Sequence, residues 1–187
     1  MKQRWMSMLL AGCLCSAAQA TEKMYGVVGA GYSDAEFSNS RAGSDLGSET
    51  FYLALGHEFA PQWYIEGGYK RLFDDSDETG NTKGDALYLA VLGKAGGPQG
   101  ELFYKLGVMS ADISGQYLMD ETDNCEVGQV IQGACDYDEG VVAGLVGLGY
   151  DYHLGLNTMI RIEYEHVRGE HNLSANLFNL GFRYNFN

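Results

Sequence analysis

Basic residues are scarce in this chain, in which 12 Lys and Arg stand against 25 Asp and Glu. Without the N-terminal segment that holds Lys2 and Arg4, 10 basic residues remain and the net charge becomes −15. Nucleic-acid-binding proteins need basic stripes on their surface, and proteins that dock on anionic lipid need a basic patch. The composition therefore argues against both kinds of partner.

Long apolar runs are missing as well. After Thr21 no stretch approaches the ~18 apolar residues that a membrane-spanning helix requires. A long apolar helix would stop an exported chain in the inner membrane. Its absence therefore fits a protein that is passed on to the outer membrane.

Cysteine is rare beyond residue 20, where only Cys125 and Cys135 occur. Both lie in a polar, acidic stretch, and in an exported chain this predicts a disulfide bond between them. The bond would stiffen the loop that it closes by about 2–3 kcal/mol in the chain-entropy model. No His or further Cys stands beside them at the spacing of zinc ligands, so we expect no metal site and no cofactor.

The first 20 residues have the pattern of a secretory signal peptide. A basic start, an apolar stretch over residues 5–14 and the small-residue cleavage pattern Ala18-Gln19-Ala20 follow one another. This predicts a signal peptide over residues 1–20 and a mature domain over 21–187. The lipobox-like run Leu10-Ala11-Gly12-Cys13 leaves a lipidated Cys13 as the alternative. We favour cleavage at Ala20, because apolar and small residues continue past Cys13; either way the chain leaves the cytoplasm.

The mature chain alternates between strand-like segments and connections of two kinds. The predicted strands are 23–33, 49–59, 62–72, 85–95, 100–112, 140–152, 157–168 and 173–186, each near the ~9–11 residues of a tilted membrane-spanning strand. Connections at 60–62, 95–99 and 153–156 are tight, whereas 33–48, 73–84 and 113–139 are long and polar, and 169–172 is shorter. Outer-membrane barrels sort short periplasmic turns from long outer loops in this way. The pattern predicts an all-β fold, an eight-stranded antiparallel up-and-down transmembrane β-barrel.

Alternation within the strands predicts which face meets the lipid. On the last strand Phe178, Leu180, Phe182, Tyr184 and Phe186 share one face, and Asn, Gly and Arg residues share the other. A membrane barrel turns its apolar face outward and its polar face toward the lumen. The first and fourth predicted strands carry apolar residues on both faces, so the pattern leaves their orientation open.

The predicted lumen face collects charges of both signs: Glu58, Glu66, Lys70, Lys105, Asp151, Arg161, Glu163, Glu165 and Arg183. We interpret them as a structural ion network, since an unpaired ion in a narrow lumen would cost several kcal/mol. A narrow, gated ion path is the alternative interpretation. A wide diffusion pore is not expected, because side chains just fill the interior of eight strands.

The chain resembles the small eight-stranded outer-membrane barrels, namely the OmpA-like transmembrane domain and the opacity-type, porin-like proteins. The resemblance rests on the signal peptide, on segments such as Gly67-Gly68-Tyr69-Lys70 and Tyr104-Lys105-Leu106-Gly107-Val108, and on the final strand. It implies a monomer in contact with outer-membrane lipid and lipopolysaccharide. It also implies that the barrel-assembly machinery recognises Phe182, Tyr184 and Phe186, although Asn187 stands where the family ends on an aromatic residue. We expect no globular periplasmic domain after the last strand. The peptidoglycan anchoring that such a domain implies in the family is therefore not expected of this chain.

Two patterns that could indicate chemistry are weak. Glu165, His166, His171 and Ser174 lie close together, as do the acid, His and Ser of some lipid-deacylating barrels, but Glu165 and His166 point to opposite faces and the His-x-Ser spacing is absent. The run 74–80 resembles a calcium loop, but Ala86 stands where its bidentate Glu belongs. We therefore expect no enzyme, and at most weak divalent-cation binding.

Two functions remain from the sequence: an integral outer-membrane barrel with a structural role, or a surface adhesin that acts through its loops, chiefly 113–139, on an unknown ligand.

Overall fold

The computed structural model describes residues 23–36, 46–77, 80–118, 129–131, 134–170 and 173–186. The predicted signal peptide, Asn187 and Cys125 lie outside these residues, and the side chain of Cys135 is not described, so the predicted cleavage and disulfide remain predictions. In the described part, no helix is long and apolar enough to cross a membrane.

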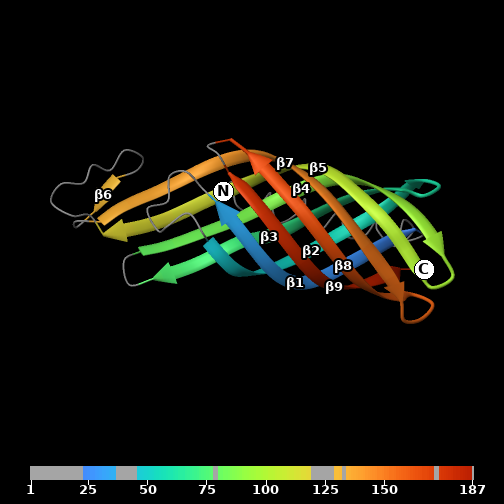
Figure 1. Cartoon of the computed structure of the whole chain (residues 1–187). Coiled ribbons are helices and arrows are strands. Elements are labelled where there is room, and N and C mark those ends of the chain that lie inside the picture. The colour runs from blue at the N-terminus through green and yellow to red at the C-terminus, as the bar shows by residue number, and fades with distance from the viewer. Residues whose placement is uncertain are drawn as a thin grey trace, which may run out of the picture.

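Eight long strands close into a single antiparallel barrel (Figure 1). They are β1 Met24–Glu36, β2 Leu46–Ala60, β3 Trp63–Asp77, β4 Gly80–Gly97, β5 Gly100–Leu118, β7 Ala134–His153, β8 Thr158–Gly169 and β9 Ser174–Phe186. Each strand pairs with the next, β1 pairs with β9, and β5 pairs with β7, so the ring has no open edge. The short β6, Gln129–Ile131, pairs with β7. The predicted up-and-down barrel is confirmed.

The two ends of the barrel differ. At one end, the turn end (right in Figure 1), strands are joined by short connections around Gln62, Gln99 and Gly155. At the other, the loop end (left in Figure 1), β6 lies beside β7. Chain direction therefore gives every strand a known orientation along the barrel axis.

The strands run further toward the loop end than the sequence predicted. β3 and β4 stay paired as far as Asp77 and Gly80, within the predicted loop 73–84. β5 and β7 stay paired as far as Leu118 and Ala134, within the predicted loop 113–139. The prediction ended each strand where the apolar outer face ended. Backbone pairing continues because a closed ladder does not need lipid on its outside.

Glycines accommodate aromatic rings across neighbouring strands. Six directly opposed pairs place a ring over a glycine: Tyr25–Gly56, Tyr52–Gly29, Phe73–Gly84, Tyr88–Gly68, Phe103–Gly149 and Tyr104–Gly93. A Cβ added at Gly68, for example, would lie 2.8 Å from the Tyr88 ring. Because a shift of one residue would place these rings against side chains, the pairs fix the register.

The structure gives β1 and β4, whose orientation the sequence pattern left undecided, a clear inner face. Tyr25 and Val27 of β1 point inward, whereas Val28 is exposed. On β4, the inner face comprises Ala86, Tyr88, Ala90, Leu92 and Lys94, and the outer face Leu87, Leu89 and Val91. A bulge between Arg71 and Phe73 turns both Leu72 and Phe73 inward.

Candidate functional site

The interior of the turn-end half is filled by charged side chains. Eight of the nine residues that the sequence placed on the lumen face are buried there: Glu66, Lys70, Lys105, Asp151, Arg161, Glu163, Glu165 and Arg183. Glu58 is only half-buried, near the turn end of β2. Two further members, Lys94 and Glu101, were missed. Lys94 lies on a strand of open orientation, and Glu101 stands at the very start of its strand, although it shares the parity of Lys105.

Arg161 of β8 forms the centre of this network. Its Nε lies 2.7 Å from Asp151 Oδ1, and its Nη1 lies 2.8 Å from Glu66 Oε2. The guanidinium carbon also lies 4.4 Å from the centre of the Phe103 ring. Glu66 in turn accepts a hydrogen bond of 2.7 Å from the Tyr25 hydroxyl. Strands β3, β7 and β8 are thus joined through one side chain.

Lys105 of β5 serves three carboxylates. Its Nζ lies 2.8 Å from Glu66 Oε1, 2.5 Å from Glu163 Oε1 and 3.0 Å from Glu165 Oε1. Glu165 also contacts Lys70, whereas Lys105 is the only cation with an ion pair to Glu163 among the described residues. Glu163 therefore depends on Lys105 for charge compensation more than Glu66 and Glu165 do.

At the turn end the network opens toward solvent. Asp151 Oδ2 lies 2.8 Å from Lys94 Nζ and 2.6 Å from Arg183 Nη1. Both cations also reach Glu101, at 3.3 Å and 3.1 Å, and the Glu101 side chain is 23% exposed. The mouth of the barrel is therefore lined by paired ions.

Among the ion pairs that the structure describes inside the barrel, the charges balance. Five carboxylates (Glu66, Glu101, Asp151, Glu163, Glu165) face five cations (Lys70, Lys94, Lys105, Arg161, Arg183). Burying ions is costly unless each is paired and hydrogen-bonded. Each of the ten has an ion pair, and of the five carboxylates only Glu163 lacks a hydrogen bond. Balance and dense pairing make this set a rigid filling rather than a site that holds a mobile ion.

The loop-end half of the interior is mostly apolar. It is packed with Leu72, Phe73, Met109, Ala111, Ile113, Val141, Leu145, Val167, Leu173 and Leu177, each at most 2% exposed. The polar residues Ser33, Ser48, Thr50, Thr82 and Asn179 are buried beside them, on β1, β2, β4 and β9. Among the described residues, no buried Lys, Arg, Asp or Glu lies above the level of Lys70 and Glu165. Large apolar side chains therefore fill most of the interior above the ion network, and a hydrated ion would have to lose water to pass them.

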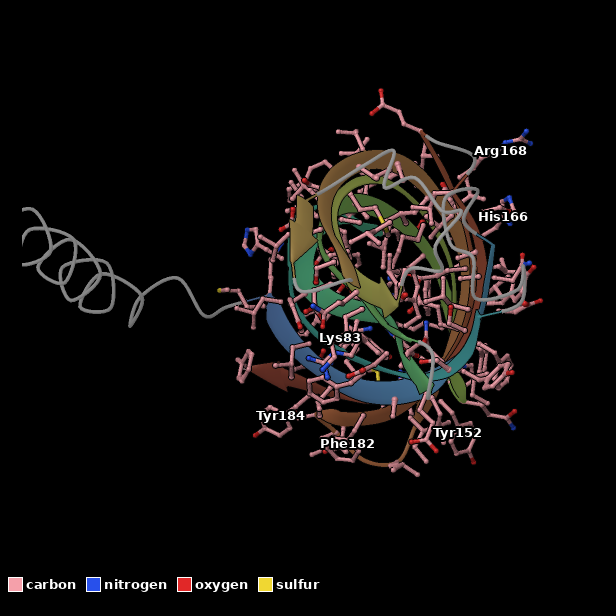
Figure 2. The ribbon with its side chains drawn as sticks, turned by 90° about the vertical axis from the view of Figure 1, so that its left-hand side faces the viewer. Lys83, Tyr152, His166, Arg168, Phe182 and Tyr184 are labelled. Carbon is pink, nitrogen blue, oxygen red and sulfur yellow. The ribbon has the colours of Figure 1, made fainter. Side chains whose placement is uncertain are left out.

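The outer wall is an apolar belt with aromatic edges. Tyr152, Phe182 and Tyr184 point away from the barrel in Figure 2. Near the turn end, the Trp63 and Tyr104 rings meet edge to face at 5.8 Å. Toward the loop end, polar groups replace apolar ones on the outer face: Tyr69 donates to Asp85 at 2.6 Å, and Arg71 Nε lies 3.1 Å from the same carboxylate. Aromatic edges of this kind mark the two boundaries of a bilayer.

The residues that could have indicated an enzyme do not form a triad. Glu165 points inward to the ion network, whereas the His166 ring nitrogen Nδ1 lies 2.9 Å from Asn176 Oδ1, on the outer face. His171 lies outside the described residues. Asp74 of the calcium-like run pairs with Arg71 and Lys83, at 3.3 Å and 3.6 Å. Within the described ranges, no group of three metal-ligating side chains occurs.

The chain is similar to a known protein family and to several solved barrels. A family model described as an outer membrane protein beta-barrel domain matches residues 6–186. No curated protein matches the sequence. Neisserial surface protein A is 13% identical with a TM-score of 0.64, over 88% of this chain and 98% of that one.

Two other solved barrels are similar in fold. Ail, the attachment invasion locus protein of Yersinia pestis, is 14% identical, and the N-terminal β-barrel domain of Pseudomonas aeruginosa OprF is 11% identical. Each has a TM-score of 0.56 and matches over 87% of this chain and 98% of its own. Short turns of such barrels face the periplasm and long loops face outward. The chain belongs to the outer membrane protein beta-barrel domain family and lies in the bacterial outer membrane.

Proposed function

We propose that the protein is a sealed structural barrel of the outer membrane that conducts no ions. The observation that carries this proposal is the dense filling of the interior. A path for ions would have to cross both the paired ion cluster and the packed Leu, Ile, Val and Phe side chains above it. The polar residues buried beside these side chains are packed as well, and Thr50 and Asn179 are hydrogen-bonded to each other.

Planar-bilayer recording tests this proposal. The purified chain, folded in detergent and added to the bilayer, should give no discrete conductance steps. The same sample should migrate on an unboiled detergent gel as a folded band, which shows that inserted barrels were present. Reproducible unitary openings from such a sample would overturn the proposal.

Surface interaction is the second candidate. β5 and β7 extend beyond the apolar belt and carry the segment 110–140, which has eight acidic residues and no Lys or Arg. Ail was solved in complex with the heparin analogue sucrose octasulfate. We infer the opposite preference for this chain, because like charges repel a sulfated polyanion. Whole cells that carry the protein should bind poly-lysine surfaces more than heparin surfaces, and a preference for heparin would contradict this candidate.

We propose no catalytic activity and a monomeric state. The orientation of Glu165 and His166 toward opposite faces supports the first. The closed ladder and the balanced interior, both complete within one chain, support the second.

A further inference from the structure

One side of β7 carries no strand over part of its length. β5 pairs with β7 from Ala134 to Tyr152. On the opposite side, β8 pairs with β7 only as far as Ala143, and β6 pairs only as far as Asp136. Figure 1 shows β7 continuing toward the loop end beyond the end of β8. Among the described residues, the stretch 137–142, here called the β7 edge, therefore has a strand on one side alone.

Backbone groups of the β7 edge point away from β5. The Val142 carbonyl accepts a hydrogen bond of 3.2 Å from the Glu170 amide, on the side that β8 occupies further down. In an antiparallel strand these directions alternate from residue to residue, so the N–H and C=O of Gly140 and Asp138 point to the same side as those of Val142. No described strand pairs with them there. An extended segment laid along the edge would meet donors and acceptors at the spacing of a β-ladder.

The other side of the extended sheet is protected. β2 pairs with β3 as far as Arg71, and a bulge between Arg71 and Phe73 follows. The Asp74 amide, beyond the bulge, donates a hydrogen bond of 2.9 Å to Ser48 Oγ of β2. Bulges and covered edges are ways in which proteins prevent the addition of a further strand. β7 runs without a register shift along β5, so in the described part its edge lacks this protection.

Charge defines the class of segment that fits the β7 edge. The stretch 134–142 contains three acidic residues and no Lys or Arg. On β5, the exposed Asp112 is paired with Gly140 and adds a further carboxylate beside the edge. A second copy of the edge would bring like charges opposite one another, which destabilises strand pairing. Lys and Arg side chains of an added strand would instead lie next to carboxylates.

We propose that the β7 edge binds a basic, extended peptide segment of a protein outside the cell. The segment adds as an antiparallel strand along 137–142, as β6 and β8 do on either side, and backbone hydrogen bonds to Asp138 and Gly140 hold it. The loop end faces outward, so the edge can be reached from the medium. This proposal rests on the second candidate function, surface interaction, and specifies how the partner is held.

A synthetic peptide of alternating lysine and threonine tests the proposal on the wild-type barrel folded in uncharged detergent. Fluorescence anisotropy compares it with the same peptide methylated at every backbone nitrogen, which keeps all the positive charges but has no N–H to donate. We expect at least tenfold weaker binding of the methylated peptide. Equal binding would overturn the proposal, because the attraction would then be electrostatic alone, and would leave the preference for poly-lysine surfaces in place.

Substitutions at Gly140 test the position of the added strand. Gly140→Pro removes an N–H that points away from β5, so the β5–β7 ladder is kept. Gly140→Ala is the matched control: it keeps the N–H, and its Cβ would meet Asp112 Oδ1 as nearest neighbour at 3.8 Å. With the folded gel band present in both variants, the lysine–threonine peptide should bind at least tenfold more weakly to Gly140→Pro and within twofold of the wild type to Gly140→Ala. Equal binding by the proline variant, or equal loss in the control, would overturn the proposal.

Hydrogen exchange on the wild type needs no variant. Saturating lysine–threonine peptide should slow exchange of the Gly140 amide at least tenfold and leave the Val141 amide, which points toward β5, unchanged. If whole cells bound poly-lysine but the peptide gave no protection at Gly140, the edge proposal alone would be wrong. If the cells bound neither poly-lysine nor the peptide, the surface-interaction candidate would fail together with it.

Discussion

Lys105 illustrates at the scale of single residues how the barrel interior is balanced. It is one of five cations, yet it contacts three of the five carboxylates, and Glu163 depends on it. Glu66 and Glu165 have other cations beside them, Arg161 and Lys70. Removing Lys105 therefore leaves Glu163 without an ion pair among the described residues, whereas Glu66 and Glu165 each keep one.

We predict that Lys105→Met destabilises the barrel by about 3–5 kcal/mol, the cost of leaving a buried charge uncompensated. The double variant Lys105→Met/Glu163→Gln should recover much of that loss, because it removes one charge of each sign. Urea-unfolding midpoints of the heat-modifiable band measure both. If the double variant were less stable than the single one, the charge balance would not be the reason for the network.

Sequence parity located most of this network but not all of it. It placed Glu66, Arg161 and Glu165 inside, because each lies on the face opposite to most of the apolar residues of its strand. It could not place Lys94, because Leu, Val and Ala on both faces of β4 look alike to a pattern based on polarity. Nor could it show that Tyr25 and Tyr88 lie inside, since tyrosines also line both edges of the lipid belt.

At the scale of strands, register is fixed by rings that lie over glycines. Gly68 and Gly67 are adjacent on β3 but face opposite ways: Tyr88 covers Gly68, whereas a Cβ at Gly67, on the outer face, would meet its nearest neighbour at 3.7 Å. The same substitution at these two positions therefore probes the two faces of one strand.

Gly68→Ala should destabilise the folded barrel by about 1–3 kcal/mol, since the added methyl group meets the Tyr88 ring and the Leu53 carbonyl. Gly67→Ala should stay within about 0.5 kcal/mol of the wild type. Unfolding midpoints in the same detergent compare the two. Equal effects would mean that Tyr88 does not hold β3 and β4 in register.

Depth along β7 gives a second comparison. Leu148 lies in the middle of the belt and is 55% exposed on the outer face, whereas Val142 is paired with Ser110, near the polar edge. Leu148→Arg should cost about 2–4 kcal/mol and Val142→Arg about 0–1 kcal/mol. Folded yield in lipid vesicles measures both. A larger loss of folded yield at Val142 would contradict the position of the membrane boundary inferred from the outer side chains.

Each of the eight predicted segments overlaps a long strand. The strands were predictable because apolar residues that face lipid alternate with polar or small residues that face the lumen. Their loop-end extensions were not predictable from the same signal. Beyond the belt, residues such as Asp112 and Ser114 on β5 face water, and alternation of apolar and polar residues no longer distinguishes an outer face from a loop.

At the scale of the whole molecule, the fold rests on the closed ladder and the filled interior rather than on its connections. A Cys125→Ser/Cys135→Ser variant should therefore keep the heat-modifiable band, because an open edge in lipid is what a barrel has to avoid. Protease added to whole cells should cut the variant faster within 119–133. Free thiols in the oxidised wild type would contradict the predicted disulfide bond. Loss of the folded band in the variant would show that the bond is necessary for the barrel.

The uneven exposure of the ion network also gives the barrel a direction. Leu72, Phe73 and Leu173 are fully buried in the loop-end half, while Glu101 is partly exposed at the opposite mouth. Protons and salt therefore have their nearest access to the network at the periplasmic end. A change of acidity or salinity in the periplasm acts on Glu101 and its partners Lys94 and Arg183 before it acts on the deeper carboxylates.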